Sequence, residues 1–470
     1  MNFSIIAKSK LPIDFINELN NDFTERNVDK ILTGMSEERY TTFRVNYLKS
    51  NEVEVEDELV KNGVEFDKVN ITEIETKSET DFETYFNFNA YVVYNKNEKD
   101  LSKLKIYEDG KIYVQSISSM IPPIILRPEP GERVLDMAAA PGSKTTQMAA
   151  MMNNEGYILA NEIDKFRCEK LKYNVEKQGA SIVHIINKDG TQLFNSAKSA
   201  DIETKGCNDH SYNSDSSDND DNNANNDNSD NNRKNESDEI IKNFDKILVD
   251  APCSGEGRFI VSNKKTYGHW SLKMQKELVE IQKKLISNSI NLCKINGTIL
   301  YSTCALSLEE NEKVIDWAIN NFNIEIEKIN INICIEKNTR VKLNDKLSQT
   351  SKLETNLTNK SEINLTSQPE TNLISKSETS LISKSETNLT SKLETNLNEE
   401  KEFVSYNSWV TKGNKKGLSD EIKKTIKILP NKLLEGFYVA KIKKLRIITA
   451  KNKKATDKVT SVAWNSNDEN

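Results

Sequence analysis

Residues 133–322 of this chain alternate short apolar runs with longer amphipathic segments, and this alternation limits the possible fold more than any other feature. The apolar runs are RVLDM at 133–137, YILAN at 157–161, VHIIN at 183–187, DKILVD at 245–250 and GTILYSTC at 297–304. The segments between them have the length and pattern of helices. Strands that alternate with helices form a parallel, doubly wound sheet, so we predict an α/β fold.

The sequence outside this pattern suggests further domains. Residues 1–95 mix one helical stretch with strand-like runs, which predicts a small N-terminal α+β domain. The domain with the alternating pattern is predicted to span 96–340. Two short strands within 402–446, in IKILPNK and GFYVAKIKKL, are expected to close the antiparallel edge of its sheet, and 447–470 forms a short tail.

Two low-complexity tracts interrupt these domains. One is the Asn/Asp/Ser-rich stretch at 209–239, and the other is an eight-residue repeat at 351–398. The repeat could stack as a solenoid, but each unit offers only about one reliable apolar residue, whereas stacking requires a continuous apolar face. We therefore predict that both tracts are disordered insertions, which surface loops accommodate at little cost in free energy.

The acidic tract also determines the net charge. The whole chain carries a formal charge of −7, and the ten acids and two bases of residues 209–239 contribute −8 of it. The remainder is nearly neutral, at +1. The acidic total therefore does not exclude a nucleic-acid partner.

Cysteine usage and hydropathy indicate the compartment. Six scattered cysteines form neither a disulfide framework nor a CxxC or Cys/His cluster, so neither structural disulfides nor a metal site is expected. No apolar run approaches the length of a membrane span, and the N-terminus lacks the pattern of a signal peptide. These features predict a reduced, cytoplasmic protein with no membrane partner.

Candidate binding residues follow four successive strands. Glu162 ends the second strand, Asp189 follows the third and Asp250 ends the fourth, while a loop of small residues follows the first. That loop is AAAPGSK, comprising Ala138, Ala139, Ala140, Pro141, Gly142, Ser143 and Lys144. Ligands bind at the carboxyl ends of parallel strands. The loop is neither a Walker A motif nor GxGxxG, so a nucleoside cofactor without a phosphate cradle, such as S-adenosylmethionine, fits best.

Together the motifs VLDMAAAPGSKTTQMAA, ANE, DAPCSGEG and YSTCALSLEENE resemble the Sun-type RNA (cytosine-5) methyltransferases, and most closely their bacterial RsmF-like branch. The resemblance spans roughly 1–335 and returns at 425–445. It implies a Rossmann-like S-adenosylmethionine-dependent methyltransferase fold, with a mostly parallel seven-stranded sheet and an antiparallel edge. It also implies that residues 138–144, Glu162, Asp189 and Asp250 bind the cofactor.

Cys253 and Cys304 each lie in an exposed turn after a strand, where a thiol is rarely needed for packing. Methylation of cytosine carbon 5 requires attack by a thiolate at carbon 6, followed by removal of the carbon 5 proton. The resemblance assigns attack to Cys304 and release to Cys253; the reverse, as in DNA cytosine methyltransferases with a Pro-Cys motif, is the alternative. Asp250 would bond the ring near N3. Lys144 would lower a thiol pKa or hold Asp250, unless it is an ordinary surface lysine.

The expected partner is RNA, with small-subunit ribosomal RNA as the first candidate. Transfer RNA is an alternative substrate, and a non-catalytic RNA-binding assembly factor is an alternative of another class. The target base must be unpaired or flipped, because a paired base hides carbon 6. We expect a monomer whose phosphate contacts come from two groups of basic residues, namely Lys8, Lys10, Arg39, Arg44, Lys441, Lys443, Lys444 and Arg446.

Overall fold

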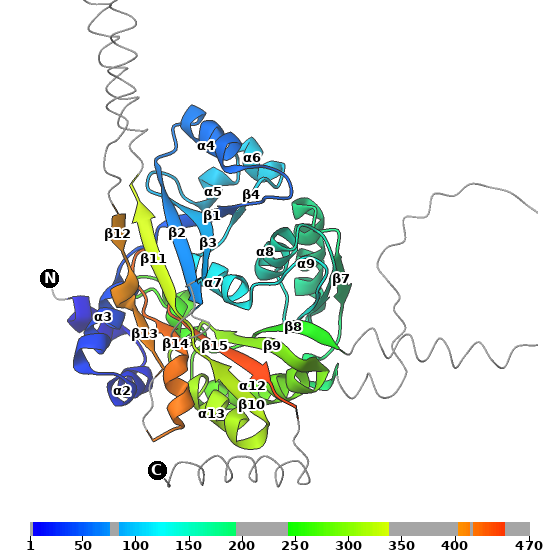
Figure 1. Cartoon of the computed structure of the whole chain (residues 1–470). Helices are drawn as coiled ribbons and strands as arrows, with labels where there is room; N and C mark the ends of the chain where they lie inside the picture. The colour runs from blue at the N-terminus through cyan, green and yellow to red at the C-terminus, as the bar shows by residue number, and fades with distance from the viewer. Residues whose placement is uncertain (1–2, 76–83, 194–242, 338–402, 414–416, 447–470) are drawn as a thin grey trace, which may run out of the picture.

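The computed structural model describes residues 3–75, 84–193, 243–337, 403–413 and 417–446, which form two β-sheets surrounded by helices (Figure 1). The predicted insertion at 209–239, the repeat at 351–398 and the tail at 447–470 lie outside the described residues, as does Cys207. The expectations for those segments therefore stay predictions.

The larger sheet is centred on five parallel strands. Across the sheet they follow the order β7 (Val183–Ile186), β6 (Tyr157–Asn161), β5 (Arg133–Asp136), β8 (Phe244–Asp250) and β9 (Cys293–Thr303). The first of these strands in sequence, β5, lies in the middle between β6 and β8, and the later strands are added on both sides of it. This is the Rossmann-like, doubly wound topology that the alternating sequence pattern predicts.

Four antiparallel strands complete one edge of this sheet. They are β15 (Phe437–Lys444), which pairs with β9, then β14 (Ile426–Ile428), β10 (Ile324–Glu327) and β13 (Val410–Lys412). The first half of β15 pairs with β14 and its second half with β10, so one long strand accommodates two short partners. The sheet therefore has nine described strands instead of the predicted seven, and only five of them are parallel.

Helices cover both faces of the larger sheet. Helices α7 (Ile117–Leu126) and α8 (Ser143–Met151) pack on one face, with α9 (Lys165–Gln178) beside α8; α12 (Leu272–Leu292) and α13 (Glu312–Asn321) pack on the other. Successive strand residues point to opposite faces. Leu248 accordingly packs into the first core, and its neighbours Ile247 and Val249 pack into the second.

The smaller sheet is entirely antiparallel among its described strands. Its order is β12 (Phe403–Ser405), β11 (Ile331–Glu336), β2 (Phe66–Glu75), β3 (Thr84–Val93), β1 (Thr41–Val45) and β4 (Ile112–Val114). Helices α4 (Glu52–Lys61), α5 (Glu98–Leu101) and α6 (Lys105–Glu108) pack against it. The predicted block 1–95 supplies β1 to β3, but β4, β11 and β12 come from later in the chain. Strand pairing therefore continues past residue 95.

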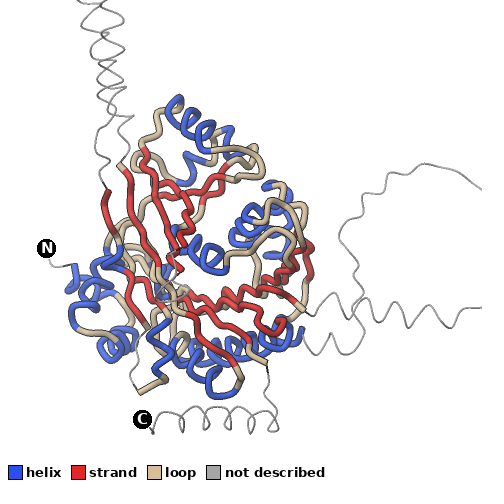
Figure 2. Tube along the Cα trace, viewed as in Figure 1, coloured by secondary structure: helices blue, strands red, loops and turns tan. Residues whose placement is uncertain are grey.

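Helix α7 joins the two sheets. It lies between β2 and β3 of the smaller sheet and β8 and β9 of the larger one, where the strands drawn in red come together (Figure 2). All of its residues except Ser119 are buried. The two sheets therefore share one core, and α7 forms the layer between them.

The N-terminal helices pack against the segment that follows Cys253. They are α1 (Phe3–Lys10), α2 (Ile13–Asp22) and α3 (Glu25–Ser36). The ring of Phe15 lies 5.1 Å from that of Phe259 and 5.6 Å from that of Trp270, centroid to centroid. Among the helices that the structure describes, none is both long enough and apolar enough to cross a membrane.

Candidate active site

The two cysteines singled out in the sequence lie side by side. The parallel neighbours β8 and β9 pair Asp250 with Ser302, so the loops after both strands leave the same edge of the sheet. The Sγ atoms of Cys253 and Cys304 are consequently 3.3 Å apart, and both side chains are half-buried. At this separation both thiols can reach neighbouring atoms of a single small ring.

The surroundings of the two thiols differ. The hydrogen bond with Cys253 lowers the pKa of Cys304; burial opposes this shift, and the positive charge of Arg258 adds to it. The same hydrogen bond and burial raise the pKa of Cys253. The backbone N–H of Cys304 also donates to Cys253 Sγ at 3.3 Å, but a neutral donor stabilises a thiolate less than a full positive charge does. Cys304 is therefore the thiol that ionises more readily.

Asp250 and Lys144 form an ion pair beside these thiols. Lys144 Nζ lies 2.7 Å from Asp250 Oδ2, and Ser302 Oγ donates to Asp250 Oδ1 at 2.8 Å. Lys144 also donates to Ser119 Oγ at 2.8 Å, and only 8% of the residue is exposed. The alternative of an ordinary surface lysine is therefore wrong, because Lys144 is buried at the start of α8 and holds the carboxylate.

The small residues 138–142 lie in the loop between β5 and α8, which begins at Ser143. The backbone of this loop is held by the N–H of Ala139, which donates to Asn161 O at 2.8 Å, and by Arg167, whose guanidinium donates to Ala140 O at 2.5 Å. Gly142 adopts a φ of 103°, which favours glycine, and a Cβ there would lie 2.9 Å from a methyl carbon of Leu171. The loop therefore runs close to α9 and leaves its small residues at the strand ends.

Glu162 follows β6 directly and is buried. Its carboxylate accepts hydrogen bonds from the N–H of Ala140 at 3.3 Å and from the N–H of Asp164 at 3.0 Å. Arg167 Nη1 lies 3.5 Å from Glu162 Oε2. The first contact joins Glu162 to the small-residue loop, so two of the predicted cofactor elements meet in the structure.

Asp189 lies beyond the end of β7, at the same edge of the sheet. Burial tends to raise its pKa, but hydrogen bonds from Thr191 and Gln192 lower it overall, so the carboxylate stays charged. The strand order places β7 next to β6, and therefore Asp189 on the Glu162 side of the sheet. No described contact joins the two carboxylates, so their joint role stays a prediction.

Several residues near the site were not singled out in the sequence. Asp136 ends β5, accepts a hydrogen bond from Thr145 Oγ1 at 2.7 Å, and has its pKa raised to about 7 by burial. Its signal was an acid at the end of a buried apolar run, immediately before the small-residue loop. Arg258, whose charge lowers the Cys304 pKa, carried no such signal, because nothing local links it to Cys304.

Some basic residues predicted to hold phosphates are not available for that role. Arg44 is 1% exposed, and its guanidinium donates to Gln115 and Thr146 side chains at 2.9 Å each. Lys441 is 9% exposed and lies 3.6 Å from Glu73. These two predictions are wrong, because strand-borne cations that look exposed in the sequence are covered by the packing of the sheets.

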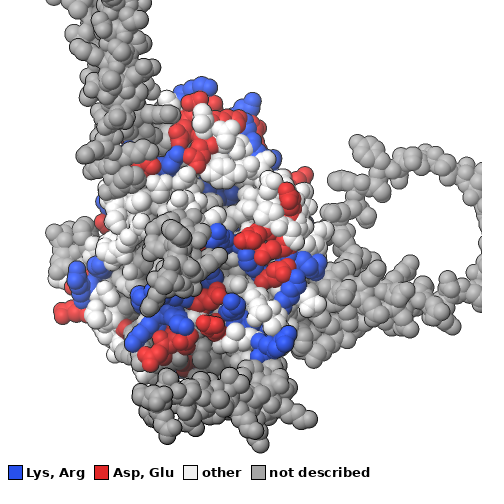
Figure 3. Space-filling model, in the orientation of Figure 1, with Lys and Arg blue, Asp and Glu red and all other residues white. Residues whose placement is uncertain are grey.

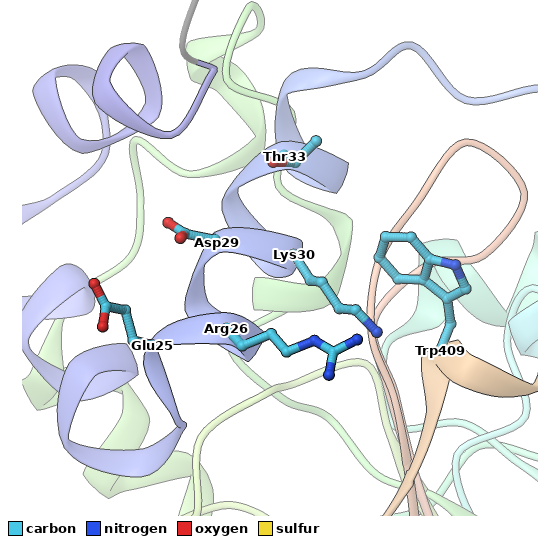
Figure 4. Close-up of a pocket in the computed structure, with 6 residues that line it drawn as sticks. All are labelled: Glu25, Arg26, Asp29, Lys30, Thr33 and Trp409. Carbon is cyan, nitrogen blue, oxygen red and sulfur yellow. The ribbon is translucent and has the colours of Figure 1, made fainter.

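Charges of both signs are interspersed on the face of the molecule shown in Figure 3. A cavity of about 510 Å³ lies between α3 and the 407–410 segment, lined by Glu25, Arg26, Asp29, Lys30, Thr33 and Trp409 (Figure 4). Arg26 and Lys30 point toward the Trp409 ring, and Lys30 Nζ lies 5.2 Å from its centroid. None of the predicted site residues lines this cavity.

The other described cysteines do not join the site. Cys168 and Cys293, which the sequence pattern predicts to pack within helices, are both buried. Cys168 does lie in α9, but Cys293 is the first residue of β9, because α12 ends at Leu292; Cys334 lies in β11. Within the described ranges, no group of three or more His, Cys, Asp or Glu side chains could hold a metal ion.

Part of the chain matches a known family of proteins. A family model described as 16S rRNA methyltransferase RsmB/F matches residues 123–202 and 223–351. The matched region, less than half of the chain, is similar to the RsmB/F methyltransferases. Among its curated relatives, the Ribosomal RNA small subunit methyltransferase F of Shigella dysenteriae serotype 1 is 34% identical over 225 residues, which cover 47% of this chain and 38% of that protein. This region holds Lys144, Glu162, Asp189, Asp250 and both site cysteines.

A second RsmB/F-like relative acts on another class of RNA according to its name. The tRNA (cytosine(49)-C(5))-methyltransferase of Pyrococcus abyssi is 33% identical over 225 residues, covering 48% of this chain and 58% of that enzyme. The chain thus spans less than two thirds of either relative. The crystal structure of NSun6 from Pyrococcus horikoshii with SFG matches 93% of this chain and 100% of its own, with a TM-score of 0.55 and 18% identity. That likeness confirms the predicted methyltransferase fold.

Proposed function

We propose that this chain is an S-adenosylmethionine-dependent methyltransferase that forms 5-methylcytosine in RNA, acting in the cytoplasm on small-subunit ribosomal RNA. The observation that carries the proposal is the 3.3 Å separation of Cys253 and Cys304 beside the Asp250–Lys144 ion pair. A non-catalytic assembly factor would need neither paired thiols nor a buried lysine on a carboxylate. The similarity of the matched region to the RsmB/F methyltransferases supports the same conclusion.

The residues at the strand ends fit S-adenosylmethionine. Glu162 offers carboxylate oxygens of the kind that accept ribose hydroxyls, and the adjacent Ile163 is 63% exposed, which provides an apolar surface for an adenine ring. Asp189 would meet the adenine edge, and loop 138–144 would hold the amino-acid end. When bound, the cofactor supplies the methyl group. The NSun6 structure was solved with SFG, an analogue of S-adenosylmethionine, which supports this choice.

Cys304 would be the thiol that attacks the cytosine ring. Its thiolate would form a bond to cytosine carbon 6, which turns carbon 5 into a nucleophile that accepts the methyl group. Negative charge then develops on the ring near N3. Asp250 would accept a hydrogen bond from the amino group beside N3, and Lys144, 2.7 Å from that carboxylate, would supply the positive charge that offsets the charge on the ring.

Cys253 would be the thiol that assists release of the methylated base from Cys304. The hydrogen bond with Cys304 is the main reason that the pKa of Cys253 is raised. Once the Cys304 sulfur is bonded to carbon 6, it no longer carries the charge that makes it a strong acceptor, so the Cys253 thiol loses its own proton to water more easily. Cys253 would then take the proton from carbon 5, the double bond between carbons 5 and 6 would re-form, and the sulfur–carbon bond would break.

Transfer RNA is the second candidate substrate. One observation favours it: the chain covers 58% of the Pyrococcus abyssi transfer RNA enzyme but 38% of the Shigella ribosomal RNA enzyme. The comparison therefore makes transfer RNA the substrate to test beside ribosomal RNA.

The test is methyl transfer from labelled S-adenosylmethionine to unmodified small-subunit ribosomal RNA and transfer RNA, with the modified nucleoside identified by mass spectrometry. We expect 5-methylcytosine in one of the two RNAs, and none with Cys304→Ala. The proposal fails if neither RNA is labelled, or if the label is found on another atom or another base.

A further inference from the structure

Two glutamates link the loops that carry the cysteines, and each binds the backbone of the opposite loop. Glu256, three residues after Cys253, accepts hydrogen bonds at Oε2 from the N–H groups of Leu306 and Ser307, at 2.8 and 2.9 Å. Glu310, six residues after Cys304, accepts from the N–H of Ser254 at 2.9 Å and from its hydroxyl. The carboxylates therefore cross between the loops.

Further contacts hold the same two carboxylates in place. Glu256 Oε1 accepts from the indole N–H of Trp270 at 2.9 Å and from the amide of Gln275 at 3.3 Å. Glu310 Oε1 also accepts from the amide of Gln282 at 3.0 Å. Every described hydrogen bond to these two side chains comes from a neutral donor.

Burying the carboxylates of Glu256 and Glu310 costs free energy, which argues for a role other than packing. Glu256 is 1% exposed and Glu310 is fully buried. In the described part of the chain, neither carboxylate lies within 4.0 Å of a lysine or arginine nitrogen. Burial raises the pKa of Glu310 to about 7, which reflects the free-energy cost of holding a carboxylate there. Leucine or methionine would fill the same space at lower cost, but could not bind four backbone and hydroxyl donors across the loops.

We propose that Glu256 and Glu310 are positioning residues that hold the Cys253 loop and the Cys304 loop in register, so that both thiols reach one base. Glu256 fixes the backbone just after Cys304, the attacking thiol, and Glu310 fixes the residue just after Cys253, the releasing thiol. The two glutamates therefore serve different steps. This inference rests on the proposed function for its kinetic consequences, but not for its geometry.

A test of the geometry does not depend on activity. Diamide oxidises two neighbouring thiols to a disulfide, and peptide mass spectrometry identifies a Cys253–Cys304 bond. The full-length wild type, with Sγ atoms 3.3 Å apart, should form this bond rapidly. Glu256→Ala and Glu310→Ala should each slow it at least tenfold, and the Gln variants, which keep an acceptor oxygen, should recover part of the rate. Glu309→Ala removes an exposed neighbour and should match the wild type.

A second measurement separates the two glutamates. Both Ala variants should lose at least tenfold in the steady-state turnover of methylated RNA, with the Kd for S-adenosylmethionine unchanged. Glu310→Ala should accumulate a covalent protein–RNA adduct, because release is impaired, whereas Glu256→Ala should not. If a variant fails to fold, its Gln counterpart takes its place. Wild-type oxidation rates in both Ala variants would overturn the proposal, as would lost activity with weakened cofactor binding. Inactivity of the wild type would instead reject the proposed function.

Discussion

The two sides of the site take their contacts from different parts of the chain. The cofactor side comprises Glu162, Asp189 and the small-residue loop after β5. The cysteine side comprises the loops that carry Cys253 and Cys304. On the cofactor side, the contacts come from nearby in the sequence: Ala140 donates to Glu162, 22 residues away, and Thr191 to Asp189, two residues away. On the cysteine side, contacts arrive from both ends of the chain. The N–H of Leu308 donates to Asp22, 286 residues away, and Lys427 Nζ donates to Leu306 O, 121 residues away.

This difference shows which part of the site can form from the central sheet alone. The described hydrogen bonds that hold the Glu162 and Asp189 carboxylates come only from the loop after β5, the start of α9 and the segment after β7. The cysteine loops also need the N-terminal helices and the closing strands: Arg39 donates to Gly257 O at 2.9 Å, and the N–H of Gly436 donates to the same oxygen at 2.9 Å. Changes far away in sequence should therefore damage the cysteine side first.

Asp250→Asn should give the largest effect of the variants that spare both cysteines. It keeps the shape of the side chain but removes the negative charge that binds Lys144. We expect the rate of methyl transfer to fall by about 10²–10⁴-fold, as is typical when a charged catalytic group is neutralised. Ser302→Ala, which removes only the 2.8 Å bond to Asp250, should cost much less. Equal losses in the two variants would contradict the assigned roles.

Lys427→Met should destabilise the cysteine side. Lys427 and Glu312 form an ion pair at 2.9 Å, with side chains 2% and 0% exposed, so the substitution removes the lysine charge from a buried carboxylate. The free energy of unfolding should fall by about 3–5 kcal/mol in a denaturant titration. Lys423→Met is the matched control, because its pair with Asp420 is exposed, and it should cost less than about 1 kcal/mol.

Glu162→Ala should act on the cofactor side alone. Charge-assisted hydrogen bonds to ribose contribute about 1.5–3 kcal/mol each, so binding of S-adenosylmethionine should weaken at least tenfold. Calorimetry on the folded variant measures this, with the exposed Glu169→Ala as control. The diamide oxidation rate of the cysteine pair should stay at the wild-type value. Unchanged cofactor affinity would remove Glu162 from the cofactor site.

Asp136→Asn should have the smallest effect, visible as a dependence of stability on pH. Burial raises the pKa of Asp136 to about 7 from 3.8, so the folded protein binds a proton that the unfolded chain releases. Its contribution to stability is therefore greatest below pH 4 and declines as the pH rises to about 7. Relative to the wild type, the melting temperature of the cofactor-free variant should increase between pH 5 and pH 8. A constant difference would mean that Asp136 is ionised in the folded protein.

The sequence predicts what depends on local pattern. The runs at 133–137, 157–161 and 245–250 are strands to within a residue, and the strand-end rule brought Asp250 next to Lys144. The sequence could not show that the side chains of Glu256 and Glu310 bind the backbone of the opposite loop. Hydrophobic periodicity carries no information on contacts between residues some 50 positions apart. The burial of Arg44 was missed for the same reason: its partner Thr146 lies 102 residues away.

The division of roles between the cysteines is the central claim, and covalent trapping tests it most directly. The wild type, Cys253→Ala, Cys304→Ala and the double variant are incubated with S-adenosylmethionine and substrate RNA, and adducts are detected on a denaturing gel. Cys253→Ala should attack and transfer the methyl group, then stall as a protein–RNA adduct with methylated cytosine at the link. Cys304→Ala and the double variant should form none. An adduct that accumulates in Cys304→Ala and is absent from Cys253→Ala would reverse the assignment.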